Sequence, residues 1–195
     1  MKISGVSGTV KRNKSKGLVA SLLFSLLAYS SAALSEDEYI WTVEKYDPTT
    51  LIVSTPGITM YGDKLRIRIV KDGCEYGQLW TSVYTMPGEG VDESTFVGKK
   101  VAAEFMGQKL SLPVFHAGEF ILGYLVMLNL GVYELNQLTK ILSTTDELNI
   151  NYLDSNEFEA KKYFDIPFNS WSTNGLRVAV NDAISQCMAL DTAIG

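Results

Sequence analysis

The feature that most constrains the fold is an alternation of apolar and charged residues in the first half of the chain. In the segment Lys64–Val70, leucine or isoleucine occupies positions 65, 67 and 69, and lysine or arginine occupies positions 64, 66 and 68. Successive side chains of a β-strand point to opposite faces, so this segment predicts a strand with one buried and one solvated face.

Further strands are predicted where β-branched and aromatic residues gather between turn signals. These segments are 39–45, 51–53, 79–84, 100–105, 109–114, 120–130, 146–152 and 163–168. Met106-Gly107-Gln108 separates two of them and predicts a hairpin. Residues 120–130 are nearly all apolar but too few to span a bilayer. We interpret them as a buried strand, because Gly123 and Gly131 disfavour a helix interior, although a buried helix is the alternative.

Two helices are predicted in the second half. The apolar residues of 135–142 fall on one helical face. Ser172-Thr173-Asn174 offers N-cap oxygens to a final helix whose apolar stripe ends at Cys187. The sequence therefore predicts an α+β fold, mainly antiparallel β, arranged as a sandwich or a strongly curved sheet. It would carry two short helices, the last one C-terminal.

The N-terminal segment, residues 1–33, predicts a secretory signal peptide. A basic start is followed by an apolar stretch from Leu18 to Ala28 and by small residues, so that cleavage after Ala33 or Ser35 satisfies the small-x-small rule. A membrane-spanning helix needs about 20 apolar residues, more than this stretch has. We expect a periplasmic or secreted protein of bacterial or phage type, with one domain over residues 36–195. An uncleaved N-terminal anchor is the alternative, and the only case in which we expect membrane contact.

The net charge bears on the class of partner. All 22 acidic residues lie at Glu36 or later, whereas five of the 17 lysines and arginines lie before it; the rest of the chain thus carries 12 bases and a net charge of −10. Nucleic-acid binding needs a basic face and is not expected. A protein partner, and in particular a cationic one, is compatible with this charge.

The two cysteines, Cys74 and Cys187, predict one disulfide. Paired cysteines of exported proteins usually bond in an oxidising compartment. The stripe of the last helix turns Cys187 toward the core, and Cys74 follows the Asp72-Gly73 turn at the end of a strand. The bond would pin the terminal helix to that strand. Two free thiols, or one catalytic thiol, are the alternatives.

No catalytic or metal-binding constellation is recognisable, and no cofactor is expected. His116 is the single histidine, whereas a metal site needs several ligands. There is no Gly-x-Ser-x-Gly nucleophile motif. Paired carboxylates could serve glycoside hydrolysis, but solvated faces are their ordinary role. An exported hydrolase that uses His116 or a carboxylate pair is therefore kept as an alternative function.

The segment Met86–Phe96 is the predicted contact surface. It is long, rich in glycine and acidic, and long loops often carry function. Four predicted partner-binding residues lie in this loop and the fifth lies outside it: Glu89, Asp92, Glu93, Phe96 and His116.

The C-terminal third carries a recognisable order of elements. An amphipathic helix leads to the alternating Leu148-Asn149-Ile150-Asn151-Tyr152, then to Phe164-Asp165-Ile166-Pro167-Phe168, and finally to a helix led by Asn174-Gly175-Leu176 that carries Cys187. This order resembles the invasion-associated locus B family of exported bacterial proteins. The resemblance implies a periplasmic or secreted, non-enzymatic β-sandwich with a terminal helix, and it assigns no functional residue.

Together these features predict an exported, non-enzymatic protein-binding domain. An inhibitor, an immunity factor or an envelope accessory protein would fit the export signal, the acidity and the single disulfide.

Overall fold

The computed structural model describes residues 41–59 and 63–192 of the 195-residue chain. Residues 1–40, 60–62 and 193–195 lie outside the described part. The predicted signal peptide and its cleavage sites fall in the first of these ranges, so they stay predictions. No helix in the described part is long and apolar enough to cross a membrane.

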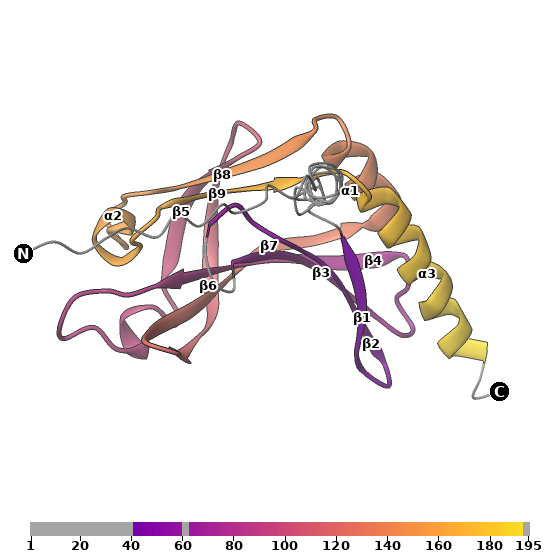
Figure 1. Ribbon diagram of the computed structural model, residues 1–195, viewed down its shortest axis with the longest axis horizontal. Coiled ribbons are helices and arrows are strands. Elements are labelled where there is room, and N and C mark those ends of the chain that lie inside the picture. Colours follow the sequence, from indigo (N-terminus) through magenta and orange to yellow (C-terminus); the bar gives the residue numbers. More distant parts are fainter. Residues whose placement is uncertain (1–40, 60–62, 193–195) are drawn as a thin grey trace, which may run out of the picture. The chain divides into compact units, whose positions relative to one another are not determined.

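In the described part the strands form one antiparallel sheet of nine, in the order β1-β2-β3-β4-β7-β6-β5-β8-β9. This confirms the predicted α+β class (Figure 1). The elements are β1 (Thr42–Asp47), β2 (Thr50–Pro56), β3 (Lys64–Val70), β4 (Tyr76–Thr85), the 3₁₀ turn η1 (Glu93–Thr95), β5 (Lys100–Phe105), β6 (Gln108–Phe120), β7 (Gly123–Glu134), α1 (Leu135–Leu142), β8 (Glu147–Leu153), α2 (Ala160–Tyr163), β9 (Phe168–Ser172) and α3 (Leu176–Thr192).

The sheet bends along β6. The first half of β6 pairs with β5 as far as Pro113, and the second half pairs with β7 from Val114 onward. The register with β7 is interrupted at Phe115, which opposes no residue of β7. Such a bulge bends a strand and increases its twist. As a result β8 and β9 lie as a second layer over β3, β4 and β7, with β5 and β6 crossing between the layers (Figure 1).

The last strand of the sheet, β9, lies beside the segments that flank β1 and β2. The backbone N–H of Ile58, just after β2, donates to the carbonyl oxygen of Ser170 in β9 at 3.1 Å. The indole N–H of Trp41 donates to the carbonyl oxygen of Ser172 at 2.8 Å. These contacts close the second layer over the first and bury the core between them. Trp171 and Phe164 are among its largest fully buried side chains.

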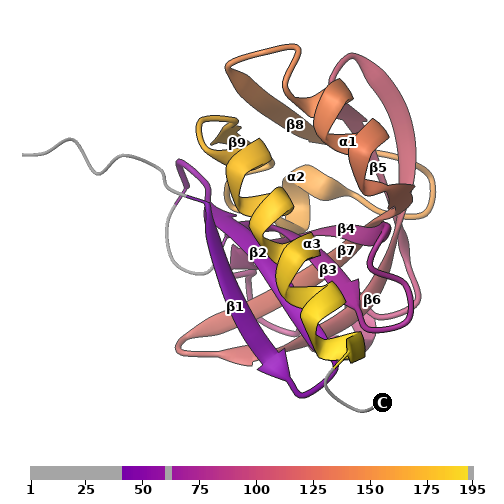
Figure 2. The same ribbon diagram turned by 90° about the vertical axis from the view of Figure 1, so that its right-hand side faces the viewer.

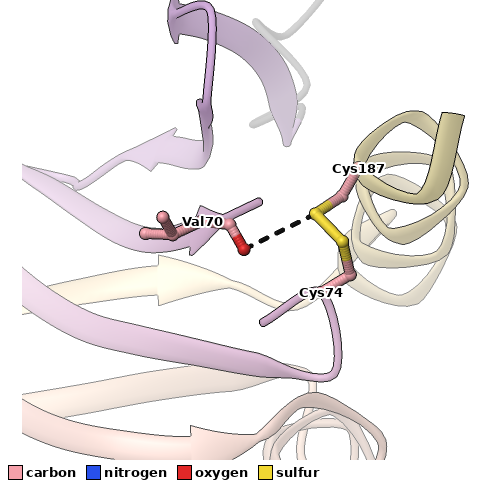
Figure 3. The surroundings of a disulfide bond; sticks show 3 residues. All are labelled: Val70, Cys74 and Cys187. Carbon is pink, nitrogen blue, oxygen red and sulfur yellow. Dashed lines mark hydrogen bonds between the residues drawn. A yellow bond between two sulfur atoms is a disulfide. The ribbon is translucent and has the colours of Figure 1, made fainter. Parts of the chain in front are cut away.

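The terminal helix α3 packs across β1, β2 and β3 (Figure 2). Its buried stripe follows the predicted spacing and contains Leu176, Val180, Ala183 and Cys187. Cys187 is bonded to Cys74, with a Cα–Cα distance of 5.7 Å, which confirms the predicted disulfide. The sulfur of Cys187 lies 3.6 Å from the carbonyl oxygen of Val70 at the end of β3 (Figure 3).

The strand predicted at residues 163–168 is wrong. Residues 160–163 form the short helix α2, and β9 begins only at Phe168. Tyr163 and Phe164 both pack against the ring of Phe96, whereas neighbouring residues of a strand would point to opposite faces. The described part therefore has three α-helices instead of two, and α3, with 17 residues, is not short.

Replacing both cysteines with alanine tests the role of the disulfide. The bond joins residues 113 positions apart, and the chain-entropy model gives a loop of this size about 4–5 kcal/mol. We expect the double variant C74A/C187A to lose about 3–5 kcal/mol in urea unfolding, and reduced wild-type protein to match it. The exposed helix position Ser185→Ala is the control. A loss below about 1 kcal/mol would show that the bond does not hold α3 in place.

Candidate functional site: a pocket around the buried Asp63

Asp63 precedes β3 and is 5% exposed. Its Oδ1 accepts a hydrogen bond from the backbone N–H of Tyr84 at 2.5 Å. Its Oδ2 accepts one from the hydroxyl of Thr59 and a longer one from Asn169 Nδ2 at 3.4 Å. One carboxylate thus joins β4, β9 and the segment that follows β2.

Where β3 and β4 separate, hydrogen bonds to side chains replace the backbone hydrogen bonds between the two strands. The last paired residues are Leu65 and Thr81. Beyond them the hydroxyl oxygen of Ser82 accepts the N–H of Lys64 at 3.1 Å, and Asp63 accepts the N–H of Tyr84. A buried backbone N–H must find a partner, so Asp63 has a structural reason to be at this strand end.

Gly57 lets β9 approach this carboxylate. Its N–H donates to the carbonyl oxygen of Asp63 at 2.9 Å. A Cβ atom at Gly57 would lie only 2.2 Å from Oδ1 of Asn169. Any larger residue would therefore displace Asn169, whose amide donates to Asp63.

The surroundings of Asp63 change its acidity. Burial raises the pKa of Asp63 from 3.8 to about 6, against the opposing effects of the hydrogen bonds from Thr59 and Tyr84 and of the charge of Arg66. Burial also lowers the pKa of Arg66 to about 10, while Glu44 and Asp63 oppose the change. The guanidinium of Arg66 donates to Ser82 Oγ at 2.7 Å and lies 4.7 Å from the ring centroid of Trp80.

The interior next to Asp63 is polar. Tyr152 of β8 is 2% exposed, and burial together with the negative charge of Asp63 raises its pKa. Thr55, Thr81 and Ser170 are buried as well. Asp63 thus lies between a polar interior and the pocket described next.

A pocket of about 470 Å³ opens above Asp63. Four of its lining residues are apolar, two are carboxylates, and two carry hydroxyl groups. They are Met86, Ile121, Leu122, Ile166, Asp63, Asp165, Thr59 and Tyr84. No lysine, arginine or histidine is among these described lining residues. Ligand sites commonly combine apolar walls with a few placed polar groups, as this pocket does.

Exposed apolar side chains surround the pocket and form what we term the apolar rim: Met86, Phe120, Ile121, Leu122 and Ile166. Leu122 is 84% exposed and Ile121 70%. Phe120 joins the rim through an edge contact with Tyr84, at 6.0 Å between ring centroids. Clustered exposed apolar residues, unlike scattered ones, mark interaction sites.

The tip of the β6–β7 hairpin is strained. Ile121 and Leu122 form a two-residue turn between the paired residues Phe120 and Gly123. Ile121 has a φ of 57°, in the left-handed region that suits glycine and is costly for a β-branched residue. Strain of this kind gathers at functional sites.

Three exposed acidic residues, Asp92, Glu93 and Glu119, form an acidic patch around Tyr124. Burial raises the pKa of the Tyr124 hydroxyl, and the three carboxylates raise it further. That hydroxyl donates to the carbonyl oxygen of Val91 at 3.2 Å. Glu119 pairs with Tyr124 one position before Phe120, so this part of the acidic patch lies on the same hairpin as the apolar rim, with its side chain directed to the opposite face from that of Phe120.

Four of the five predicted contact residues are exposed: Glu89, Asp92, Glu93 and His116. A Cβ atom on Gly118 would lie 3.3 Å from Nε2 of His116 and 3.9 Å from Oε1 of Glu93. The structure therefore brings His116 close to the acidic patch. Glu89 lies further along the loop.

Phe96 is the exception, and its predicted contact role is wrong. It is fully buried, and its ring lies 5.7 Å from that of Tyr124 and 6.4 Å from that of Phe164. Its burial anchors the loop to the core, so it cannot touch a partner in the folded chain.

Neither the burial of Asp63 nor the apolar rim was predicted from the sequence. An acidic residue before a strand is common on a solvated surface, and nothing nearby in the sequence indicates its burial. Phe120-Ile121-Leu122 was assigned to one continuous strand from 120 to 130. Gly123 was the available signal, because glycine often marks the end of a turn.

Searches against protein-family models, curated proteins and solved structures found no match for this chain.

The raised pKa of Asp63 predicts a pH-dependent stability. The folded state favours protonated Asp63. Protonated Asp63 therefore contributes its whole share to the free energy of unfolding below about pH 3.8, and this contribution is lost as the pH rises through about 6. Urea unfolding from pH 4 to 7 should show wild-type stability falling relative to Asp63→Asn by about 2 kcal/mol. Asp146→Asn, at an exposed site, should follow the wild type. Parallel curves for wild type and Asp63→Asn would contradict the assignment.

Proposed function

We propose that this chain is an exported, non-enzymatic protein-binding domain that contacts its partner through the apolar rim. The observation that supports this most is the exposure of five large apolar side chains around one pocket. Such a surface reduces solubility in a free monomer, and a partner that covers it removes that disadvantage.

The hairpin tip supports the same surface. Glycine at the first position of the turn would relieve strain, and a polar second residue would favour solubility. Instead Ile121 has a positive φ, and both Ile121 and Leu122 are highly exposed. Folding alone gains nothing from this choice, whereas binding gains apolar contact area.

Charge supports a cationic partner. Glu119 of the acidic patch lies on the β6–β7 hairpin whose tip carries part of the rim, and the chain from Glu36 onward carries a net charge of −10. Acidic surfaces steer cationic proteins into encounter. The exported location rests on the predicted signal peptide, and the resemblance to the invasion-associated locus B family agrees with it. Within this proposal the domain serves as an inhibitor, an immunity factor or an envelope accessory protein.

Ile121→Gly separates binding from folding. Relief of the positive φ should raise the free energy of unfolding by about 1 kcal/mol. The lost apolar contact should weaken the partner complex about tenfold or more. The measurements are urea unfolding, and affinity for the protein captured from envelope extract at low salt.

Met106→Gly is the matched control, because Met106 also has a positive φ, 50°, in the β5–β6 hairpin turn outside the rim. It should leave partner affinity unchanged. A capture experiment that recovers no partner, or an Ile121→Gly variant that binds as wild type does, would contradict the proposed function.

A further inference from the structure

Among the described residues that line the pocket, none places a positive charge next to its buried acid. Asp63 lies at its inner end and Asp165 at its rim, and the described lining residues include no base. The positive charge of Arg66 acts on Asp63, but the guanidinium of Arg66 donates to Ser82 and lies over the ring of Trp80. The pocket therefore favours an occupant that brings a cation.

The hydrogen bonds of Asp63 limit the geometry of that cation. A carboxylate offers about four acceptor directions. Tyr84, Thr59 and Asn169 already occupy three of them. A guanidinium fork needs two acceptor directions for its paired hydrogen bonds, whereas an ammonium needs one. The remaining capacity suits an ammonium.

The apolar walls specify the rest of the occupant. Met86, Ile121, Leu122 and Ile166 line the path to Asp63. A lysine has a four-carbon stem that packs along apolar surface and a terminal ammonium that reaches a polar group. The rim is broader than the pocket, since Ile121 and Leu122 remain largely exposed. This extent fits a protein partner better than a small amine.

We propose that the partner inserts a lysine side chain into this pocket, with its ammonium on Asp63 and its stem against the apolar rim. This inference rests on the proposed function. The thermodynamic consequence is that binding favours ionised Asp63, so affinity rises as the pH rises through about 6. The other groups that face Asp63 are Arg66 of β3, Tyr152 of β8 and Asp165 across the pocket.

Hexylamine tests the inference on the purified chain without the partner. At pH 7.5 we expect hexylammonium to bind at least tenfold more tightly than 1-hexanol, and more tightly than hexylguanidinium. The amides of Met86, Ile121 and Ile166 should shift in NMR spectra. Asp63→Asn should reduce hexylammonium affinity to that of 1-hexanol, and Asp146→Asn should leave it unchanged.

Equal affinity for hexylammonium and 1-hexanol, or full affinity in a folded Asp63→Asn variant, would overturn the inference. Wild-type affinity measured from pH 5 to 7.5 needs no variant, and a flat profile would also overturn it. If hexylammonium does not bind while Ile121→Gly still weakens partner capture, the proposed lysine insertion is wrong but the proposed docking surface is supported. If hexylammonium binds through Asp63 while Ile121→Gly leaves capture intact, the proposed function is wrong at this surface.

Discussion

The hydrogen bonds of the Asp63 carboxylate are the interaction on which the rest of the site depends. They hold β4, β9 and the segment after β2 together at the end where the sheet returns to its beginning. A carboxylate at this position satisfies backbone and side-chain donors but is costly to ionise, because water is largely excluded. The same group therefore completes the fold and leaves an unneutralised acid beneath a pocket.

The opposite end of β3 is fixed by covalent chemistry. There the disulfide between Cys74 and Cys187 ties α3 to the turn after β3. The two ends of one strand thus have different roles: the disulfide end secures the helix over the sheet, and the Asp63 end carries the apolar rim. A rigid sheet between them allows strain at Ile121 to persist, since the paired residues Phe120 and Gly123 fix the turn on both sides.

The spacing of apolar residues in the sequence correctly predicted the elements in which that spacing has a clear strand or helix period. β3 and β5 were predicted with the bounds they have, and the stripe of α3 predicted the partner of Cys74. The errors arose where tertiary packing decides. Tyr163 and Phe164 pack together against Phe96, and this contact prevents the predicted strand. Phe96 itself is buried, although the loop around it is acidic. The burial of Asp63 depends on Asn169, 106 residues away, which no local pattern records.

We propose above that the partner covers the end of the sheet around Asp63. Amide chemical-shift mapping of the chain, free and bound to its captured partner, tests this most directly. The largest changes should fall at Met86, residues 120–123 and Ile166. Largest changes on the exposed face of α3, or around Val132 near the other end of β7, would contradict the claim.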